Sequence, residues 1–373
     1  MKKQYDIAAY IWPAYTGDEP RTRMFWPDGI GEWQSVKSAT AKYEGHTWPR
    51  EPVWGYVNEA DPAVMEMEIE EAVSHGVNVF IYDWYWYDRR PFLEGCLNDG
   101  FLRAKNNGKM KFYLMWANHD AVHLWNKELA DTDVFNVPIW RGGVERVEFE
   151  RVCERILDKY FGLDNYYKID GKPVFMIYDI KTFVDGLGGR EAAKEALDWF
   201  KKRAAERGFC GVHLQFTGRR GTTYNLSGVD GGSAVDSISL VNDLGFDSFT
   251  HYQYAHLTDV DRDYNEINED IKKIWDDCSE SYGMPYYAHV SCGWDNNPRF
   301  KKFVPRVVKN NTPENFEKIL RSAKEYADNH EGQVPLITIN SWNEWTETSY
   351  LQPDSLYGYG YLNAIKRVFV DEE

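Results

Sequence analysis

The chain has 373 residues, of which 43% are hydrophobic, and this length permits either several average domains or one large barrel. Its formal net charge of −16 disfavours nucleic acid as a partner, because phosphate binding needs basic patches. The five cysteines are widely spaced and none forms a CxxC pair, so the sequence indicates no disulfide framework and no zinc site. We therefore expect a protein that needs no metal and no cofactor.

The N-terminus and the hydropathy pattern bear on localisation. Two lysines follow Met1, as in the basic start of a secretion signal, but Asp6 and Pro13 interrupt any apolar segment after them. No run of apolar residues is long enough to span a membrane. We expect a soluble monomer that is cytoplasmic as the sequence stands, and periplasmic or secreted if a signal peptide has been removed.

Apolar segments that alternate with helical patterns run along the whole chain. Each apolar segment is followed by polar and aromatic residues, and most of these clusters are followed by a helix. The expected strands are residues 7–10, 77–82, 111–116, 174–178, 212–216, either 237–240 or 248–249, 285–290 and 336–340. The expected helices are residues 62–75, 92–105, 145–160, 191–207, 261–282, 312–330 and 359–370.

This alternation, repeated about eight times, predicts an α/β fold, a single (β/α)8 TIM barrel that occupies residues 1–373. The polar and aromatic clusters all follow the strands, so they are expected on long loops at the C-terminal face of the barrel. The first of these loops, between residue 12 and the helix at residue 62, is long and rich in tryptophan. A loop of that length inside a compact domain is usually functional.

The last predicted strand, Leu336–Asn340, leads into a polar and aromatic segment that contains Glu344 and Glu347. If this segment turns helically, the two carboxylates lie on one face. Two carboxylates at the C-terminal end of a strand, beside Trp342 and Trp345, suit acid and base chemistry on a sugar. A solvated loop with two surface glutamates is the alternative.

The other strand ends supply candidate sugar-binding residues. Aromatic residues make up 16% of the chain, and tryptophan and tyrosine present flat faces on which pyranose rings stack, although a large aromatic core is the alternative. Asp83 and Asp179 could instead cap the loops that follow them. His119 and Asp120 could form a structural pair or a metal site, and we favour the structural pair. The expected sugar platforms are Trp12, Trp84, Trp116, Tyr252 and Trp294, the expected hydroxyl-binding residues are Asp83, Asn118 and Asp179, and the wider surface includes Tyr10, His119, Asn343 and Trp345.

The segment Asn343-Glu344-Trp345-Thr346-Glu347-Thr348, with Gln352-Pro353 after it, resembles the corresponding segment of glycoside hydrolase family 99, the endo-α-mannosidases. The wider pattern is similar to WbsX-type proteins, which are often labelled glycosyltransferases and occur with surface-polysaccharide genes. That pattern includes residues 10–15, Phe25-Trp26, and residues 76–86. The resemblance spans nearly the whole chain, and it implies a (β/α)8 barrel.

The resemblance also implies roles for the two glutamates. In the mannosidases the first glutamate is a base that deprotonates the sugar 2-hydroxyl, which gives an anhydrosugar intermediate with retention, and the second is the general acid. Glu344 would then be the base and Glu347 the acid/base. Two positions depart from the family pattern, because Thr346 stands where histidine is usual and Thr348 where glycine is usual.

These observations lead to one hypothesis and two rivals. The hypothesis is a retaining glycoside hydrolase that acts on a complex bacterial-type polysaccharide or glycan, with Glu347 as acid/base and Glu344 as assisting base or nucleophile. The first rival is a sugar-nucleotide-dependent glycosyltransferase of surface-polysaccharide (O-antigen-like) biosynthesis, although the sequence shows no evident diphosphate cradle, no DxD-type metal pair at an expected strand end and no division into two domains. The second rival is a non-catalytic carbohydrate-binding barrel, which would bind glycans without changing them.

Overall fold

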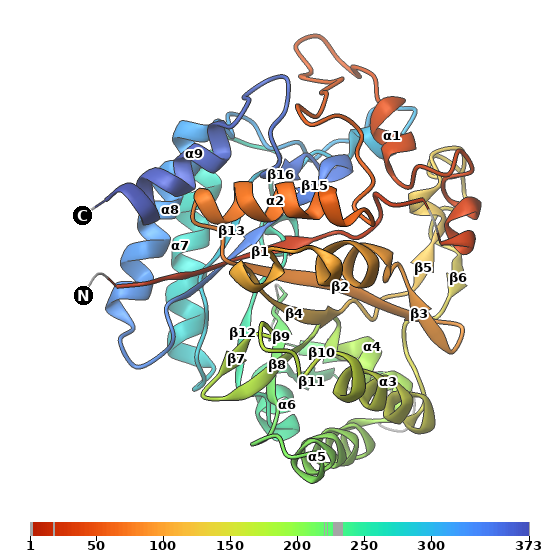
Figure 1. Cartoon of the computed structure of the whole chain (residues 1–373), viewed down its shortest axis with the longest axis vertical. Helices are drawn as coiled ribbons and strands as arrows, with labels where there is room; N and C mark the ends of the chain where they lie inside the picture. The colour runs from red at the N-terminus through yellow and green to blue at the C-terminus, as the bar shows by residue number, and fades with distance from the viewer. Residues whose placement is uncertain (1–2, 18, 220, 222, 227–233, 373) are drawn as a thin grey trace.

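The computed structural model describes residues 3–17, 19–219, 221, 223–226 and 234–372, and its centre is a barrel of eight parallel strands (Figure 1). The strands follow the spatial order β12-β9-β8-β4-β2-β1-β14-β13. The circle closes where Phe249 of β12 bridges Tyr286, just before β13. The eight strands are β1 (Asp6–Ile11), β2 (Val79–Tyr87), β4 (Lys111–Trp116), β8 (Lys172–Ile177), β9 (His213–Thr217), β12 (Ser248–Thr250), β13 (His289–Ser291) and β14 (Leu336–Asn340).

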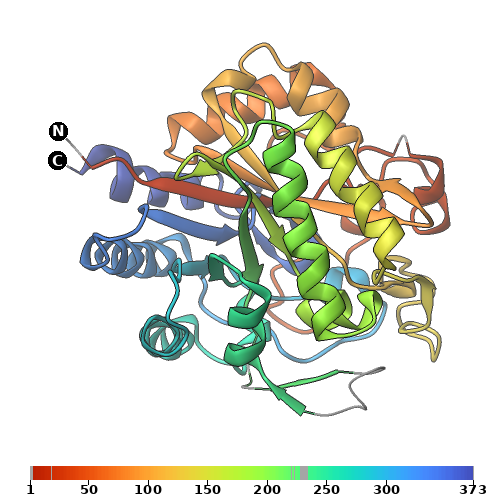
Figure 2. The ribbon, with the colours of Figure 1, turned by 90° about the horizontal axis from the view of Figure 1, so that it is seen from below.

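Helices cover the outside of the barrel, as Figures 1 and 2 show. Parallel strands inside a ring of helices confirm the predicted (β/α)8 barrel. The helices around it are α2 (Pro62–Ser74), α3 (Arg146–Lys159), α4 (Ile180–Leu187), α5 (Arg190–Glu206), α6 (Ser237–Leu244), α7 (Tyr264–Ser281), α8 (Pro313–Asn329) and α9 (Gly360–Lys366).

Two expected elements take a different form. Residues 237–240 were one of two possible positions for the sixth strand, but they begin α6, because the Asp236 side chain caps that helix by accepting from the Ser239 N–H. The sixth strand is β12, the other expected position. Residues 92–105 do not form one regular helix: they contain a π-helical turn, Cys96–Gly100, and a 3-10 turn, Phe101–Arg103. Gly100 packs so closely on the Glu59 carbonyl that a Cβ there would clash with it.

Short hairpins extend the strand ends. β3 (Arg90–Phe92) folds back on β2, and β5 (Ala121–Val122) pairs with β6 (Pro138–Trp140) at the C-terminal end of the barrel. β7 (Lys168–Ile169) pairs with β8, and β15 (Asn343–Glu344) pairs with β16 (Ser349–Tyr350). The hairpin of β10 (Thr223–Asn225) and β11 (Ala234–Asp236) projects from the body of the molecule in Figure 2.

Side chains inside the barrel are buried and include many polar groups. The Tyr113 hydroxyl donates to Gln215 Oε1 over 3.0 Å, and His289 Nδ1 lies 3.0 Å from Thr338 Oγ1. Buried polar groups with partners of this kind make the barrel interior a packed core and not a pore. The C-terminal mouth is therefore the part of the barrel that is free to carry a site.

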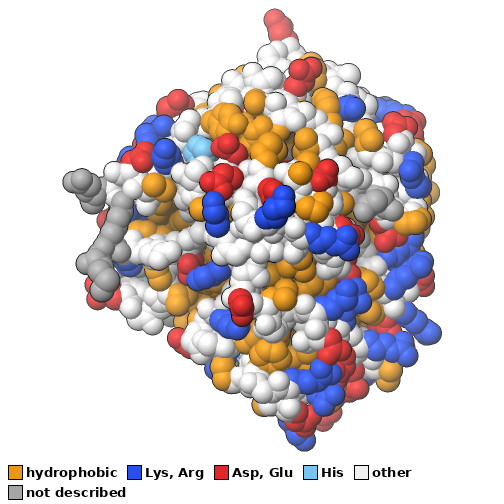
Figure 3. Space-filling model, viewed as in Figure 1, with side chains coloured by type: hydrophobic (Ala, Val, Ile, Leu, Met, Phe, Trp, Pro, Cys, Tyr) orange, Lys and Arg blue, Asp and Glu red, His pale blue; other side chains and the backbone are white. Residues whose placement is uncertain are grey.

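The surface is mixed in charge in spite of the net charge of −16. Acidic and basic side chains are interspersed over the face seen in Figure 3, and no large single-sign patch stands out on it. In the part of the chain that the structure describes, no helix combines the length and the apolar character needed to cross a membrane.

Candidate active site

The loop after β14 brings Glu344 and Glu347 to one side of the chain. Glu344 ends the short strand β15, and Glu347 ends a 3-10 turn, Trp345–Glu347. Residues three apart eclipse each other in a 3-10 helix, so the helical turn on which the prediction depended is present in this form. The Ser341 hydroxyl oxygen accepts the Glu344 N–H over 2.7 Å and fixes the start of the turn.

One buried guanidinium connects both glutamates to a third carboxylate. Arg299 lies in a 3-10 turn, Asn297–Arg299, in the loop after β13. Its Nη1 lies 2.7 Å from Glu347 Oε1, its Nη2 3.4 Å from Glu344 Oε2, and its Nε 3.3 Å from Glu32 Oε1. All four side chains are buried. We call this group the carboxylate cluster, and its three acidic groups share a single positive charge.

This shortage of positive charge favours protonated carboxyls. Burial, and then the charge of Glu347, raises the pKa of Glu344 well above its usual range. Burial also raises the pKa of Glu347, and the guanidinium of Arg299 offsets only part of that rise. Glu347, at 2.7 Å from Arg299, is therefore the more easily ionised of the two, and Glu344 holds its proton more tightly.

Tyr252 links Glu344 to a fourth carboxyl group. Its hydroxyl oxygen lies 2.8 Å from Asp83 Oδ2 and 2.9 Å from Glu344 Oε1. A hydroxyl has one proton to donate, so both contacts can be hydrogen bonds only if one of the carboxyls is itself protonated. Burial raises the pKa of Asp83 well above its usual range, which makes neutral Asp83 one way to satisfy both contacts.

A second pair of buried carboxyls, Glu59 and Glu68, holds the loop that carries Glu344 in place. Asn343 Nδ2 lies 3.0 Å from both oxygens of Glu59, and the Trp342 indole N–H donates to Glu68 Oε2 over 2.7 Å. Asn343 also makes hydrogen bonds with both the N–H and the carbonyl of Trp12. These contacts fix the loop that carries Glu344 against both α2 and the first loop of the barrel.

We expect Glu68 to make the protein less stable at high pH. Burial raises its pKa to about 7, above the value of about 4.3 of an unfolded glutamate. The folded chain binds this proton more tightly than the unfolded chain, so the contribution to stability is complete below about pH 4 and is lost as pH rises through about 7. In Glu68→Gln, whose amide cannot ionise, thermal unfolding followed from about pH 5 to about pH 9 should give a shallower fall of Tm than in the wild type. Equal slopes in the two proteins would contradict this.

Thr348, directly after Glu347, has left-handed backbone angles, with φ 54° and ψ 35°. A β-branched residue is strained there, and glycine is not, which explains why glycine suits this position. The threonine side chain compensates by accepting from the Trp48 indole N–H and donating to the Asp295 carbonyl. Thr348→Ala loses both hydrogen bonds and keeps the backbone strain. Thr348→Gly loses the same two hydrogen bonds but removes the strain. We expect the glycine variant to unfold with a free energy about 1 kcal/mol higher than that of the alanine variant, measured by urea titration.

Some of the expected binding residues lie around the carboxylate cluster. Tyr10 packs edge-on against Tyr252, with ring centroids 4.8 Å apart, and the Trp12 indole N–H donates to Glu32 Oε2 over 2.6 Å. His119 lies in the aromatic wall of the mouth, 5.5 Å from the Tyr178 ring, and burial lowers its pKa. Asp83, Tyr252 and these residues form the part of the predicted surface that the structure brings together.

Two expected sugar platforms lie elsewhere, and this corrects the prediction. Trp84 and Trp116 occupy neighbouring positions on β2 and β4 and point outward, into the layer between the barrel and its helices. The Trp116 ring packs against Phe149 and Phe183, and the Trp84 indole N–H donates to Glu94. Both side chains face the helix layer, so neither can stack on a sugar at the mouth of the barrel. Trp12 and Tyr10 lie on the mouth side but are as deeply buried, so they also offer no free face to a sugar.

Other expected binding residues have structural contacts. Asn118 and Asp179 cross-link the ends of β4 and β8 through hydrogen bonds with the backbone of Asp179. Asp179 also caps α4, as the alternative interpretation expected. Trp345 stacks on Tyr350 at 3.9 Å. Among the described residues, no group of three or more His, Cys, Asp and Glu side chains is placed to hold a metal ion.

Two members of the carboxylate cluster, Arg299 and Glu32, were not found from the sequence. Glu32 lies in the long first loop, beside Trp33, and the length of that loop was the available signal for it. Arg299 follows the polar residues at the end of β13 by a few positions. Neither residue belongs to a recognisable motif, and the contact between them joins positions that are far apart in the chain.

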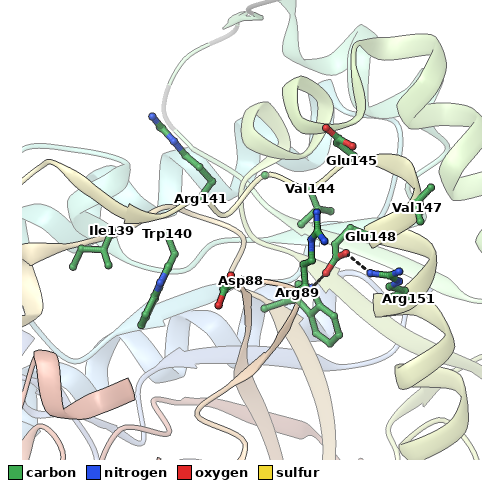
Figure 4. A pocket seen from close by; sticks show the side chains of 12 residues that line it. Asp88, Arg89, Ile139, Trp140, Arg141, Val144, Glu145, Val147, Glu148 and Arg151 are labelled. Atoms are coloured by element: carbon green, nitrogen blue, oxygen red, sulfur yellow. Dashed lines mark hydrogen bonds and ion pairs between the residues drawn. The ribbon is translucent and has the colours of Figure 1, made fainter. Parts of the chain in front are cut away.

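Two hollows lie near the mouth besides the buried cluster. A groove of about 520 Å³ beside α3 is lined by Trp86, Trp140 and three arginines, among others (Figure 4). Much of its polar lining is already paired. Glu148 accepts from the Trp86 indole and forms an ion pair with Arg151, and a second ion pair joins Arg141 to Asp120. A cavity of about 530 Å³ lies on the other side, against Asp295 and Thr348.

Comparisons with known proteins agree with this architecture. Residues 7–365 match the family described as Glycosyltransferase WbsX. The uncharacterized protein WxcX of Xanthomonas campestris pv. campestris (strain B100) is 22% identical over 361 residues, which cover 93% of this chain and 47% of that protein. The chain thus spans about half the length of the curated relatives that it matches.

Solved structures show the same barrel. The GH99 endo-α-mannosidase from Bacteroides thetaiotaomicron has a TM-score of 0.61 at 15% identity, and the match covers 99% of this chain and 98% of that one. A glycoside hydrolase-like protein has a TM-score of 0.62 at 13% identity and covers 99% and 94% of the two chains. At this identity the likeness establishes the fold alone. The match over residues 7–365 identifies the chain as a member of the WbsX glycosyltransferase family, with a barrel like that of the family 99 endo-α-mannosidases.

Proposed function

We propose that this protein is a retaining glycoside hydrolase that cleaves a complex polysaccharide or glycan. The observation that carries the proposal is the buried pair Glu344 and Glu347, bridged by Arg299 at the C-terminal mouth of the barrel. Glu347 Oε2 is buried and has no hydrogen-bond partner among the described residues, so it keeps an unused acceptor that a sugar hydroxyl would satisfy. Glycosidic cleavage needs such a pair, one group to protonate the leaving oxygen and one to assist attack at the anomeric carbon.

In this proposal Glu347 is the acid/base and Glu344 the base or nucleophile. By the base route, Glu344 takes the proton of the sugar 2-hydroxyl, whose oxygen attacks the anomeric carbon while Glu347 protonates the departing oxygen. Water then attacks the same carbon, Glu347 takes the proton of the water, and Glu344 returns its proton to the 2-oxygen. Two displacements at one carbon retain its configuration.

The pKa order of the two glutamates gives Arg299 a part in this cycle. Glu347 is the more easily ionised of the two because Arg299 holds it, yet an acid must begin the reaction protonated. We propose that a sugar oxygen takes over the Arg299 contact on binding. Burial then acts on Glu347 without compensation and raises its pKa, so the proton of Glu344 moves to Glu347, which becomes the acid while Glu344 becomes the base.

Asp83 and Tyr252 would position the sugar. Asp83 Oδ1 is buried and has no hydrogen-bond partner among the described residues, and its other oxygen is held by Tyr252. A neutral carboxyl fixed in this way can both donate to and accept from sugar hydroxyls. The fold relation to endo-α-mannosidases supports mannose-like glycans as the first substrates to test.

The experiment is a screen of purified bacterial polysaccharides and their oligosaccharides, without nucleotide, in which released reducing sugar is measured. Wild type, Glu344→Gln and Glu331→Gln are compared. Glu331 is an exposed residue before β14, at the opposite end of the barrel from Glu344, and it serves as the matched control. Release by the wild type and the control, but not by Glu344→Gln, is expected. Binding of a glycan without turnover would favour a non-catalytic barrel instead.

The family description itself favours one second candidate, a glycosyltransferase. This activity would use a sugar nucleotide as donor, so the same panel is repeated with nucleotide sugars. Transfer that requires the nucleotide, together with no release in its absence, would replace the hydrolase proposal with this one.

A further inference from the structure

The cavity of about 530 Å³ beside the carboxylate cluster has exposed aromatic rings that the proposed chemistry does not use. We call it the Trp294 pocket, after the tryptophan that lines it. Thr348 also lines it, and the adjacent Asp295 donates its N–H to the Glu347 carbonyl over 2.8 Å. The pocket thus shares a wall with the loop that carries the proposed acid.

Aromatic side chains in the pocket are open to solvent. Phe303 is 52% exposed and Tyr43 is 43% exposed, which is unusual for large rings in a protein whose other aromatics are mostly buried. Tyr43 is held in place because its ring stacks on His46 at 4.6 Å, and His46 Nε2 lies 2.6 Å from Asp295 Oδ2. Phe303 packs edge-on against Tyr43. Rigid, exposed rings of this kind are the surfaces on which the CH faces of pyranoses stack.

The polar lining of the pocket is close to neutral. Lys309 and Asp261 form an exposed ion pair of 3.0 Å, and their charges cancel. Arg50 and Asp295 are buried and are already bound, to Tyr350 and His46 respectively. Groups that donate and accept around aromatic faces, with no surplus charge, match the hydroxyls of an uncharged sugar better than a uronic acid or a phosphate.

We propose that the Trp294 pocket is a second sugar-binding site, which holds a neutral pyranose unit of the same glycan whose bond lies at Glu347. That one glycan spans both places rests on the proposed function. Sugar binding in the Trp294 pocket does not depend on it. A volume of about 530 Å³ is within the range of pockets that enclose small ligands. A glycan that occupies both places must contain at least one pyranose unit besides the one that is attacked at the carboxylate cluster.

The test measures sugar binding where cleavage is blocked. Saturation-transfer NMR is recorded on Glu347→Gln with the methyl glycosides of mannose, glucose, galactose, rhamnose and N-acetylglucosamine, and with methyl glucuronide as the anionic comparison. The same spectra are taken after adding Trp294→Ala or Phe303→Ala to that variant. Tyr56→Ala is the control, because Tyr56 is 36% exposed but does not line the pocket.

At least one neutral glycoside should bind, methyl glucuronide should bind less, and either pocket substitution should weaken binding about tenfold while the control does not. Two results would overturn the inference: no neutral glycoside binds, or the pocket substitutions leave binding unchanged. Binding that depends on Trp294 without turnover of any glycan would retain the pocket and contradict only the hydrolase. Turnover of a glycan together with sugar binding that does not depend on Trp294 would retain the hydrolase proposal and contradict the pocket.

Discussion

Replacement of Glu347 by glutamine is expected to lower kcat by about 10²- to 10⁴-fold, because the glycosidic oxygen would leave without a proton. Glutamine can still accept a hydrogen bond from Arg299 through its amide oxygen, so the cluster should keep its geometry. The substitution also removes one negative charge from a buried cluster in which three acidic groups share one guanidinium. We therefore expect the unfolding temperature to stay the same or to rise.

A substrate with a better leaving group separates the roles of the two glutamates. Fluoride departs without protonation, so Glu347→Gln should lose much less activity on a glycosyl fluoride than on a natural glycan. Glu344→Gln should lose activity on both, because attack at the anomeric carbon still needs its assistance. Initial rates for the two variants and for the Glu331→Gln control decide the matter. Equal losses by Glu347→Gln on both substrates would contradict its role as the acid.

Replacement of Arg299 by methionine is expected to cost about 3–5 kcal/mol of stability near neutral pH, because it leaves buried carboxylates without their counter-charge. The guanidinium lowers the pKa of both Glu344 and Glu347, so in the variant both values rise further. A carboxyl whose pKa is raised by folding stabilises the folded state at low pH, and that contribution is lost as pH rises through the folded pKa. The variant should thus be nearest to the wild type at about pH 5 and lose stability steadily above it.

Thermal unfolding of Arg299→Met over that pH range tests this, with Arg299→Lys as the matched variant. Lysine keeps the charge but not the fork that reaches three carboxylates, so its loss should be intermediate. In an activity assay, the acidic limb of the kcat/KM profile should move to higher pH in Arg299→Met, because Glu344 must ionise to act as a base. A pH-independent loss of stability would show that Arg299 acts through packing and not through its charge.

Much of the barrel could be predicted from the sequence because each strand is a short apolar run followed by polar residues. The exceptions have local causes. Residues 237–240 have the composition of a strand, but Asp236 caps them as a helix. Trp116 ends an apolar run as the other strand-end residues do, and it was expected to face the mouth of the barrel. However, successive side chains point to opposite faces of a strand, and Trp116 directly follows Met115 on β4. With Tyr113 and Met115 facing the interior, Trp116 must face the helices.

In the candidate site, too, some contacts follow from the local sequence and others do not. Glu344 and Glu347 are three residues apart in one segment, so their proximity follows from local geometry. Arg299 and Glu32 reach them from the loop after β13 and from the first loop, through contacts that no spacing in the sequence encodes. Those contacts set the protonation of the pair, so the electrostatics of the site could only be read from the structure.

The configuration of the first product tests the central claim most directly. Proton NMR would follow the anomeric signals while the wild type cleaves the first glycan found in the screen, before mutarotation mixes the anomers. The account predicts that the anomer of the substrate appears first and that its signal does not form with Glu347→Gln. Initial release of the opposite anomer would contradict it, because a single displacement would then have taken place at the Glu344 and Glu347 pair.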